Sequence, residues 1–330
     1  MSDTTPAPRH DDARRHRACP RGRRSRSYPR DASTGPARCV LGADAGAADS
    51  QEKKGDDDAG DEPQNTLTRK FSDAEWTAVK ELRAQLPEIF AEAYAAKEDK
   101  QAPVTLWGVQ IDPASPKDAR VSVVLIKFLR ARDLKVAEAR KMLTDTLKWR
   151  EDFKLAEVLK EEFPEKIFGG LGKIYGKSKD GHPVVYNIYG GSDVNAVFGD
   201  VDRFLRWRVA FMEKCIEELD FENVDQMVQI HDYEGVSMMS RTPGQKAAAS
   251  QASALFSSYY PELLSRKFFV NVPTVMAWVF WLFKALVPAK TMEKFSMVGT
   301  GLKVIGVELL PLVDAGELPK RYGGEALGWD

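Results

Sequence analysis

The segment MVQIHDYEG, residues Met227–Gly235, has the composition of a buried strand that ends at a glycine. Side chains alternate between the two faces of a strand, so every second residue is expected on the same side of a sheet. One side would then carry Met227, Gln229, His231 and Tyr233. A neighbouring histidine and tyrosine can hold a metal ion, or they can be hydrogen-bonded residues of an ordinary core. The residues alone leave both interpretations open.

On both sides of this segment the sequence alternates between strand and helix patterns. Residues 173–176 and 183–189 have strand patterns and flank the turn Lys179-Asp180-Gly181, which predicts a hairpin. Further elements are predicted as helices over 200–220, 243–260 and 274–294, strands over 226–233 and 267–272, and a short strand and helix near 295–298 and 301. This alternation indicates an α/β fold with a mostly parallel sheet flanked by helices.

Before the α/β region, apolar residues recur at helical spacing. Ser72-Asp73-Ala74-Glu75 has the spacing of a capping box and is expected to start a helix that extends through Leu86. Two more amphipathic helices are predicted, one from Pro116 and one from Val136. The helix that starts at Ser72 is expected to connect to the helix from Pro116 through residues 106–109. These helices predict a small helical lobe at the N-terminal side of the sheet.

The chain is therefore expected to have three parts. These are a disordered tail over residues 1–65, a helical lobe over residues 66–160 and an α/β domain over residues 161–326. The tail is rich in Pro, Gly, Ala, Ser and charge, and it has few large apolar side chains to offset the entropy of ordering.

Composition excludes some classes of function. The chain has 330 residues with 48 basic and 49 acidic side chains, so no overall charge attracts nucleic acid. Three cysteines give no disulfide framework, and no secretory signal pattern opens the chain, which predicts a reducing, cytosol-facing location. The sequence has no phosphate-binding glycine loop, no His/Cys metal spacing and no Gly-x-Ser-x-Gly motif, so a binding protein is favoured over an enzyme.

The predicted helix 274–294 is apolar on all sides around Trp278 and Trp281. A helix of this kind is either fully buried or in contact with lipid, so it can be a core helix or a movable lid at a membrane interface. Its apolar run contains Pro273 and Lys284 and is shorter than the roughly 20 residues needed to cross a bilayer. We therefore expect no transmembrane helix here.

Arg208 lies at helical spacing from Phe204 and Phe211, on the apolar side of the predicted helix 200–220. An unpaired buried charge is costly, so this arginine must reach solvent, pair with an internal acid or face an anionic ligand. An internal ion pair or solvent exposure is the ordinary outcome. A ligand carboxylate or phosphate is the functional alternative.

Several short motifs occur in one order along the chain. They are Phe128-Leu129-Arg130-Ala131-Arg132, Lys148-Trp149-Arg150, Tyr259-Tyr260-Pro261-Glu262, Phe269-Val270-Asn271-Val272-Pro273 and Leu318-Pro319-Lys320-Arg321-Tyr322-Gly323-Gly324. In this combination the chain resembles the CRAL-TRIO lipid-transfer family over about residues 70–326. The resemblance implies a helical N-lobe and a sheet that floors a deep apolar cavity, with the aromatic helix 274–294 as its gating lid.

Within that family the chain is most similar to the fungal phosphatidylinositol-transfer branch. Glu262 and Lys294 match the positions of its inositol-lipid signature, where a lysine suits a phosphodiester and a carboxylate can accept from inositol hydroxyls. The resemblance therefore implies phosphatidylinositol as a partner. Met227 and Gln229 replace the small hydroxyl residues that recognise the choline lipid, so phosphatidylcholine exchange is expected to be absent or weak.

The triplet His231-Asp232-Tyr233 resembles a subgroup of fungal homologues that hold haem in the cavity. The resemblance implies haem b with Tyr233 as the iron ligand and His231 beside it, because a phenolate favours ferric iron. It also implies that Arg208 and Lys267 contact the propionates and that Tyr189 is a further aromatic contact. Arg132 stands where those homologues are expected to have another tyrosine, which puts the open face of the iron in doubt.

The leading hypothesis is a non-enzymatic cytoplasmic carrier that binds phosphatidylinositol or haem and docks transiently on endoplasmic reticulum membranes. It would serve phosphoinositide homeostasis and the response to oxidative stress. One alternative is a plain lipid-exchange module without haem. Another is a haem peroxidase or catalase, which is less favoured because no distal His–Arg or His–Asn pair is evident.

Overall fold

The computed structural model describes residues 62–236, 243–272 and 292–329, all within one compact unit of the chain, residues 56–330. Almost all of the predicted tail, residues 1–65, lies outside the described residues. So does most of the predicted lid helix, residues 274–294, although Lys294 itself is described.

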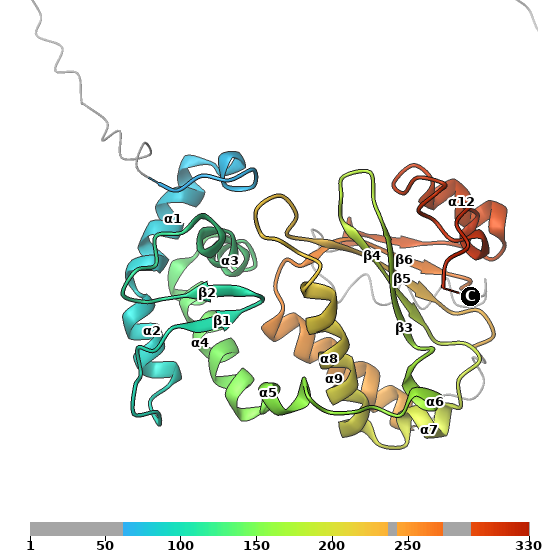
Figure 1. The fold of residues 1–330 in the computed structure, drawn as a ribbon, viewed down its shortest axis with the longest axis horizontal. Coiled ribbons are helices and arrows are strands. Elements are labelled where there is room, and N and C mark those ends of the chain that lie inside the picture. Colours follow the sequence, from blue (N-terminus) through green and yellow to red (C-terminus); the bar gives the residue numbers. More distant parts are fainter. Residues whose placement is uncertain (1–61, 237–242, 273–291, 330) are drawn as a thin grey trace, which may run out of the picture. The chain divides into compact units, whose positions relative to one another are not determined.

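A five-stranded sheet forms the centre of the α/β domain, with the strand order β3-β4-β5-β6-β7 (Figure 1). The strands are β3 (Gly172–Lys177), β4 (Pro183–Ile188), β5 (Met227–Asp232), β6 (Leu264–Val270) and β7 (Phe295–Met297). β3 and β4 form the predicted antiparallel hairpin, and the strands from β4 to β7 are parallel. The expectation of a mostly parallel sheet is confirmed. β6 starts at Leu264, three residues before the predicted start at Lys267.

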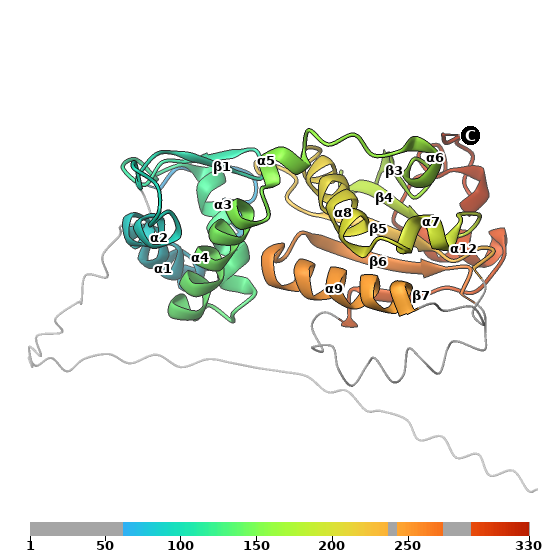
Figure 2. The ribbon, with the colours of Figure 1, turned by 90° about the horizontal axis from the view of Figure 1, so that it is seen from below.

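The two faces of the sheet pack against different helices. Val228 and Ile230 of β5 belong to a hydrophobic cluster with α12 (Leu302–Leu309), whereas Met227 packs in the cluster that contains residues of α8 (Val201–Ile216). In Figure 2, α8 and α9 (Pro243–Tyr259) lie along one face of the sheet and α12 lies at the other. The predicted alternation of β5 therefore holds, because its two sets of side chains enter two separate cores.

The helical region is built from α1 (Asp73–Ala84), α2 (Leu86–Ala93), α3 (Ala119–Arg130) and α4 (Val136–Asp152). The capping box is present, because Ser72 accepts from the backbone of Glu75 and the Glu75 carboxylate accepts from the backbone of Ser72. Two details differ from the prediction. The first helix breaks at Gln85, just before Pro87, and a hairpin forms at the expected connector. Its strands are β1 (Val104–Leu106) and β2 (Val109–Ile111).

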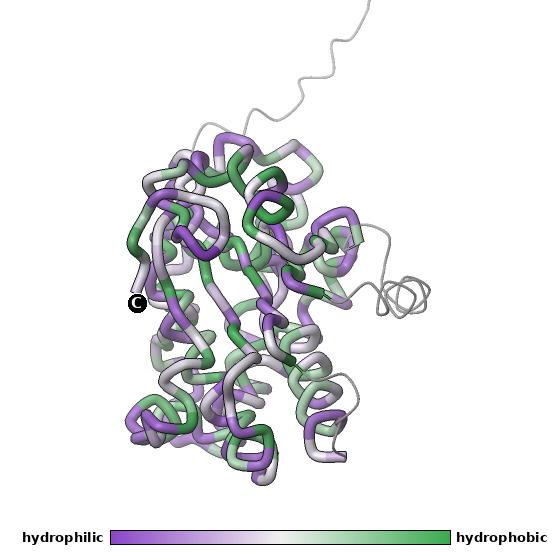
Figure 3. Tube along the Cα trace, turned by 90° about the vertical axis from the view of Figure 1, so that its right-hand side faces the viewer, coloured by the Kyte–Doolittle hydropathy of each residue, from purple (hydrophilic) through white to green (hydrophobic). Residues whose placement is uncertain are grey.

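The remaining elements are short. They are α5 (Leu155–Val158), α6 (Glu165–Phe168), α7 (Val194–Phe198) and two 3-10 turns, η2 (Thr68–Lys70) and η4 (Lys320–Tyr322). Hydrophobic residues follow the central strands, while the surrounding helices alternate between hydrophobic and hydrophilic residues (Figure 3). This pattern is expected when amphipathic helices cover a buried sheet.

Candidate functional site

The sheet face towards α8 carries a group of polar side chains around His231. The parallel register places Asn187 of β4 and Phe269 of β6 on either side of His231. The His231 Nδ1 atom lies 2.9 Å from the Tyr189 hydroxyl, and its Nε2 atom lies 3.3 Å from Gln229 Oε1. Only 6% of His231 is exposed. The histidine is thus held by hydrogen bonds at both ring nitrogens.

Aromatic rings surround this histidine. Tyr189 and Tyr233 lie 5.3 Å apart between ring centroids, and Phe269 lies 5.5 Å from His231 and 6.4 Å from Tyr233. Tyr233 is half-buried, follows directly after β5 and donates its backbone N–H to Val270 O at 3.1 Å. The structure therefore brings three predicted haem residues, Tyr189, His231 and Tyr233, into one group.

Arg208 and Lys267 add positive charge to this group. Arg208 is 7% exposed, and its Nη1 atom is buried without a hydrogen-bond partner. Its guanidinium lies over the rings of Phe256 and Phe211, 4.9 Å and 5.7 Å from their centroids. The Lys267 ammonium lies 5.3 Å from the Phe269 centroid. Among the described residues, no carboxylate forms an ion pair with Arg208 or Lys267.

The two cations alter the protonation of the group. Burial and then the charge of Arg208 lower the pKa of Lys267 from 10.5 to about 7. Burial, followed by the charges of Lys267 and Arg208, lowers the pKa of His231 well below 6.5. Neutral His231 can accept hydrogen bonds, while an anion beside Arg208 and Lys267 would keep both cations charged. The arrangement suits a ligand with an acidic group and a flat aromatic or apolar body.

Glu262 and Lys294 form the second predicted site. Lys294 Nζ lies 2.9 Å from Glu262 Oε2 and also donates to Leu264 O at 3.0 Å. Both side chains of the pair are 23% exposed, so a ligand can still reach them. The Lys294 carbonyl accepts from the backbone N–H of Lys267 at 2.8 Å, which connects this site to β6. The structure brings the two predicted lipid residues into direct contact.

Sequence reasoning missed Asn187 and Phe269 as neighbours of the histidine. The signal for Asn187 was present, because it is the one amide in the otherwise apolar strand Pro183–Ile188. Phe269 could be found only from the register between β5 and β6.

Arg132, at the position where a tyrosine was expected, follows the end of α3 and donates to the Ala131 carbonyl at 2.8 Å. It lines a cavity of about 430 Å³ together with Lys148 and Trp149. None of the predicted haem or lipid residues lines this cavity. Arg132 therefore lines a cavity that none of the residues around His231 lines.

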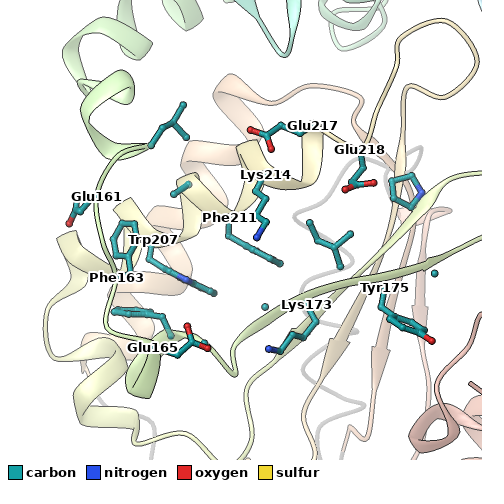
Figure 4. Close-up of a pocket in the computed structure, with 18 of the residues that line it drawn as sticks. Glu161, Phe163, Glu165, Lys173, Tyr175, Trp207, Phe211, Lys214, Glu217 and Glu218 are labelled. Atoms are coloured by element: carbon teal, nitrogen blue, oxygen red, sulfur yellow. The ribbon is translucent and has the colours of Figure 1, made fainter. Parts of the chain in front are cut away.

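A larger cavity, of about 1030 Å³, lies between α8 and the outer strand β3 (Figure 4). Trp207 and Phe211 line it from α8, and Lys173 and Tyr175 line it from β3. Glutamates and lysines both line it, so its charge favours no single class of ligand. None of the predicted site residues lines it.

The described residues contain no group of three or more His, Cys, Asp or Glu side chains placed to hold a metal ion. No described helix is both long and apolar enough to cross a membrane.

Comparisons with known protein families give two matches. Residues 167–324 match the CRAL/TRIO domain, and residues 78–145 match the CRAL/TRIO N-terminal domain. The first match covers the whole five-stranded sheet, and the second covers most of the helical region.

Fungal proteins named phosphatidylinositol transfer protein sfh5 are similar to this chain. The Sclerotinia sclerotiorum protein is 41% identical over 236 residues, which are 67% of this chain and 56% of that protein. The Aspergillus fumigatus protein is 39% identical over 237 residues, which are 67% of this chain and 55% of that protein. The chain thus spans little more than half the length of these relatives. A crystal structure of Sfh5 is 30% identical with a TM-score of 0.65, and the match covers 77% of this chain and 88% of that one.

Proposed function

Since the chain belongs to the CRAL/TRIO domain family, we propose that it is a carrier that binds phosphatidylinositol and moves it between membranes without catalysing a reaction. The names of its relatives support this lipid class. The observation that carries the proposal is the partly exposed pair of Glu262 and Lys294, 2.9 Å apart. A lysine can bind the phosphodiester, and the neighbouring carboxylate can accept hydrogen bonds from inositol hydroxyls.

Transfer of labelled phosphatidylinositol between vesicles tests this function. Wild-type protein should move the lipid, and the double variant Glu262→Gln with Lys294→Met should lose at least about tenfold in rate, because a charge-assisted site is removed. The matched control is the ion pair of Glu161 and Arg206, which is 2.6 Å long and similarly exposed. Glu161→Gln with Arg206→Met should leave transfer unchanged. Wild-type protein that moves no phosphatidylinositol would refute the proposal.

We further propose that the same protein binds haem b at the group around His231, with Tyr233 as the iron ligand. The support is the pair of cations, Arg208 and Lys267, that lack an acidic partner among the described residues. Haem propionates would compensate these charges, and the rings of Tyr189 and Phe269 would contact the macrocycle. Bound haem would supply a redox-active iron, which is the reason to link the protein to oxidative stress.

The visible spectrum of protein expressed with ample haem tests this second proposal. Wild-type protein should carry haem, and Tyr233→Phe should lose most of the iron because phenylalanine has no ligand atom. Tyr175→Phe is the control, because Tyr175 lies on β3 and lines the cavity of about 1030 Å³, away from the group around His231. Colourless wild-type protein contradicts haem binding, and unchanged iron content in Tyr233→Phe removes Tyr233 as the ligand.

We also propose that the carrier works in the cytoplasm and docks transiently on endoplasmic reticulum membranes, where it would affect phosphoinositide homeostasis. Lipid transfer itself requires contact with a donor and an acceptor membrane. Reversible sedimentation with microsomes that depends on their phosphatidylinositol content is the expected result. Protein that stays in the supernatant under all conditions contradicts this location.

A further inference from the structure

Lys127 is a fully buried cation in the middle of α3. Only 1% of it is exposed, and the residues around it, from Val121 to Leu129, are also buried. Its ammonium donates to the Asp225 carbonyl at 2.7 Å, to the Asp225 carboxylate at 2.7 Å and to the Glu262 carbonyl at 3.0 Å. A lysine ammonium has three N–H donors, so all of its hydrogen bonds are made within the protein.

The acceptor on Glu262 is unusual because the backbone of this residue is left-handed, with φ of 53°. Residues with a Cβ rarely adopt this region unless surrounding contacts hold them there. Two side chains do so here, because the Glu262 carbonyl accepts from Lys127 Nζ and from Gln226 Nε2 at 3.1 Å. The carboxylate of the same residue meets Lys294.

We infer that Lys127 is a positioning residue for the site of the phosphatidylinositol headgroup. Lys127 holds the left-handed backbone of Glu262 so that the Glu262 carboxylate meets Lys294. This role rests on the proposed lipid function. Lys127 lies 135 positions before Glu262 in the chain, within the segment that matches the N-terminal family domain. The helical region thereby contributes to the lipid site without contacting the lipid.

A purely structural role is the competing explanation. Lys127 forms a buried ion pair with Asp225, and loss of a buried ion-pair partner destabilises a protein wherever it lies. The two explanations differ in their effect on the folded protein. A structural residue changes stability alone, whereas a positioning residue also changes the affinity of folded protein for the lipid.

The test measures phosphatidylinositol affinity and transfer for the full chain with Lys127→Met, corrected for the folded fraction. We expect at least about tenfold weaker binding, in line with the loss of a charge-assisted site. The control is Arg83→Met, which removes another buried cation of the helical region, paired with Glu62 at 2.7 Å and bonded to Ser122. Arg83→Met should lower stability and leave the affinity of folded protein unchanged.

Combination with Glu262→Gln separates action through Glu262 from any other effect. If Lys127 acts through this carboxylate, Lys127→Met should cause little further loss of affinity in the Glu262→Gln protein. Additive losses, or wild-type affinity in folded Lys127→Met, overturn the inference while leaving the lipid function intact. Failure of wild-type protein to bind phosphatidylinositol overturns the lipid function as well.

A milder variant serves if Lys127→Met does not fold. Gln226→Met removes the second donor to the Glu262 carbonyl from a half-buried side chain, without leaving a charge unpaired. We expect about threefold weaker lipid binding, because one of the two hydrogen bonds that hold the backbone is lost. Unchanged affinity in Gln226→Met overturns the positioning role.

Discussion

Two buried tyrosines differ in a single hydrogen bond. Tyr186 and Tyr322 are both fully buried, and their rings stack at 5.1 Å. The Tyr322 hydroxyl donates to the buried carboxylate of Asp232 at 2.9 Å, whereas the Tyr186 hydroxyl has no partner among the described residues. Asp232 lies between His231 and Tyr233, so this bond fixes the strand end that carries the candidate haem residues.

We predict opposite outcomes for the removal of these two hydroxyl groups. Tyr322→Phe should lower the free energy of unfolding by about 1–3 kcal/mol, because a buried carboxylate loses a donor. Tyr186→Phe should be neutral or slightly stabilising, because it removes a buried polar atom that is unsatisfied. Urea unfolding followed by circular dichroism measures both variants. Equal losses in the two variants contradict the prediction.

Helix α12 and the turn η4 approach each other through two glycines. Gly323 has φ of 91°, and a Cβ built on it would lie 2.6 Å from Leu302 O and 2.9 Å from the Gly306 Cα. Backbone cannot yield as a flexible side chain can, so a side chain at this position is excluded by both contact and conformation. The close contact lets the C-terminal segment, with Tyr322, reach the sheet.

We therefore predict that Gly323→Ala lowers the free energy of unfolding by about 2 kcal/mol or more, from backbone strain and overpacking. Gly316→Ala is the matched control, because a Cβ there meets nothing within 4 Å and its φ is not positive. That variant should change stability by less than about 0.5 kcal/mol. Thermal or urea unfolding measures the stability of both variants. Similar stability of the two would contradict the prediction and show that α12 can move aside.

The helical region and the α/β domain share one hydrophobic core and a buried polar network. Arg150 of α4 lies 2.7 Å and 3.1 Å from the two carboxylate oxygens of Glu213 on α8, which also accepts from the Tyr260 hydroxyl at 2.7 Å. Beside them Trp149 stacks on Tyr259 at 4.5 Å. These contacts connect segments that are more than sixty positions apart.

Removal of Arg150 should therefore affect the whole compact unit. Arg150→Met is expected to cost about 3–5 kcal/mol of unfolding free energy, because Glu213 would remain buried without its cation. Arg140→Met is the control on the same helix, since Arg140 makes longer contacts with the more exposed Glu88 and Glu92. It should cost less than about 1 kcal/mol. A small loss in Arg150→Met would mean that water replaces the arginine.

The pH dependence of stability should reflect the lowered pKa values of Lys267 and His231. Burial and then Arg208 lower the pKa of Lys267 from 10.5 to about 7, so between these values the unfolded chain holds a proton that the folded protein lacks. Rising pH therefore stabilises the ligand-free fold, on the order of 2 kcal/mol between pH 7 and pH 9. The lowered pKa of His231 also makes stability rise with pH, and this stabilisation is lost as pH falls below 6.5.

Unfolding of ligand-free protein at pH 7 and pH 9 measures this effect. Lys267→Met should flatten the dependence, because the titrating group is gone. Lys303→Met, at an exposed position of α12, should preserve it. An equal pH dependence in wild-type protein and Lys267→Met contradicts the assignment. A bound anion should also flatten it, because an anion keeps Lys267 protonated.

Local chemistry explains which parts of this protein could be predicted. The capping box of Ser72 and Glu75 spans only four residues, and the alternation of β5 follows from the geometry of any strand. The hairpin around Trp107 was missed because its strands have three residues each and show no clear period. The helix break at Gln85 was missed because apolar residues continue at helical spacing across it, although Pro87 was a signal.

Motifs along the chain therefore identified the family, the α/β layout and the residues that could bind ligands, because each motif is a short local pattern. The arrangement of the sites depended on contacts between distant segments. Tyr189, after β4, meets His231 of β5, and Lys127 of α3 reaches Glu262, 135 positions away between α9 and β6. The surroundings of Arg208 have the same origin. The folded chain brings Phe256 and Lys267 near this arginine, and no spacing in the sequence encodes that neighbourhood.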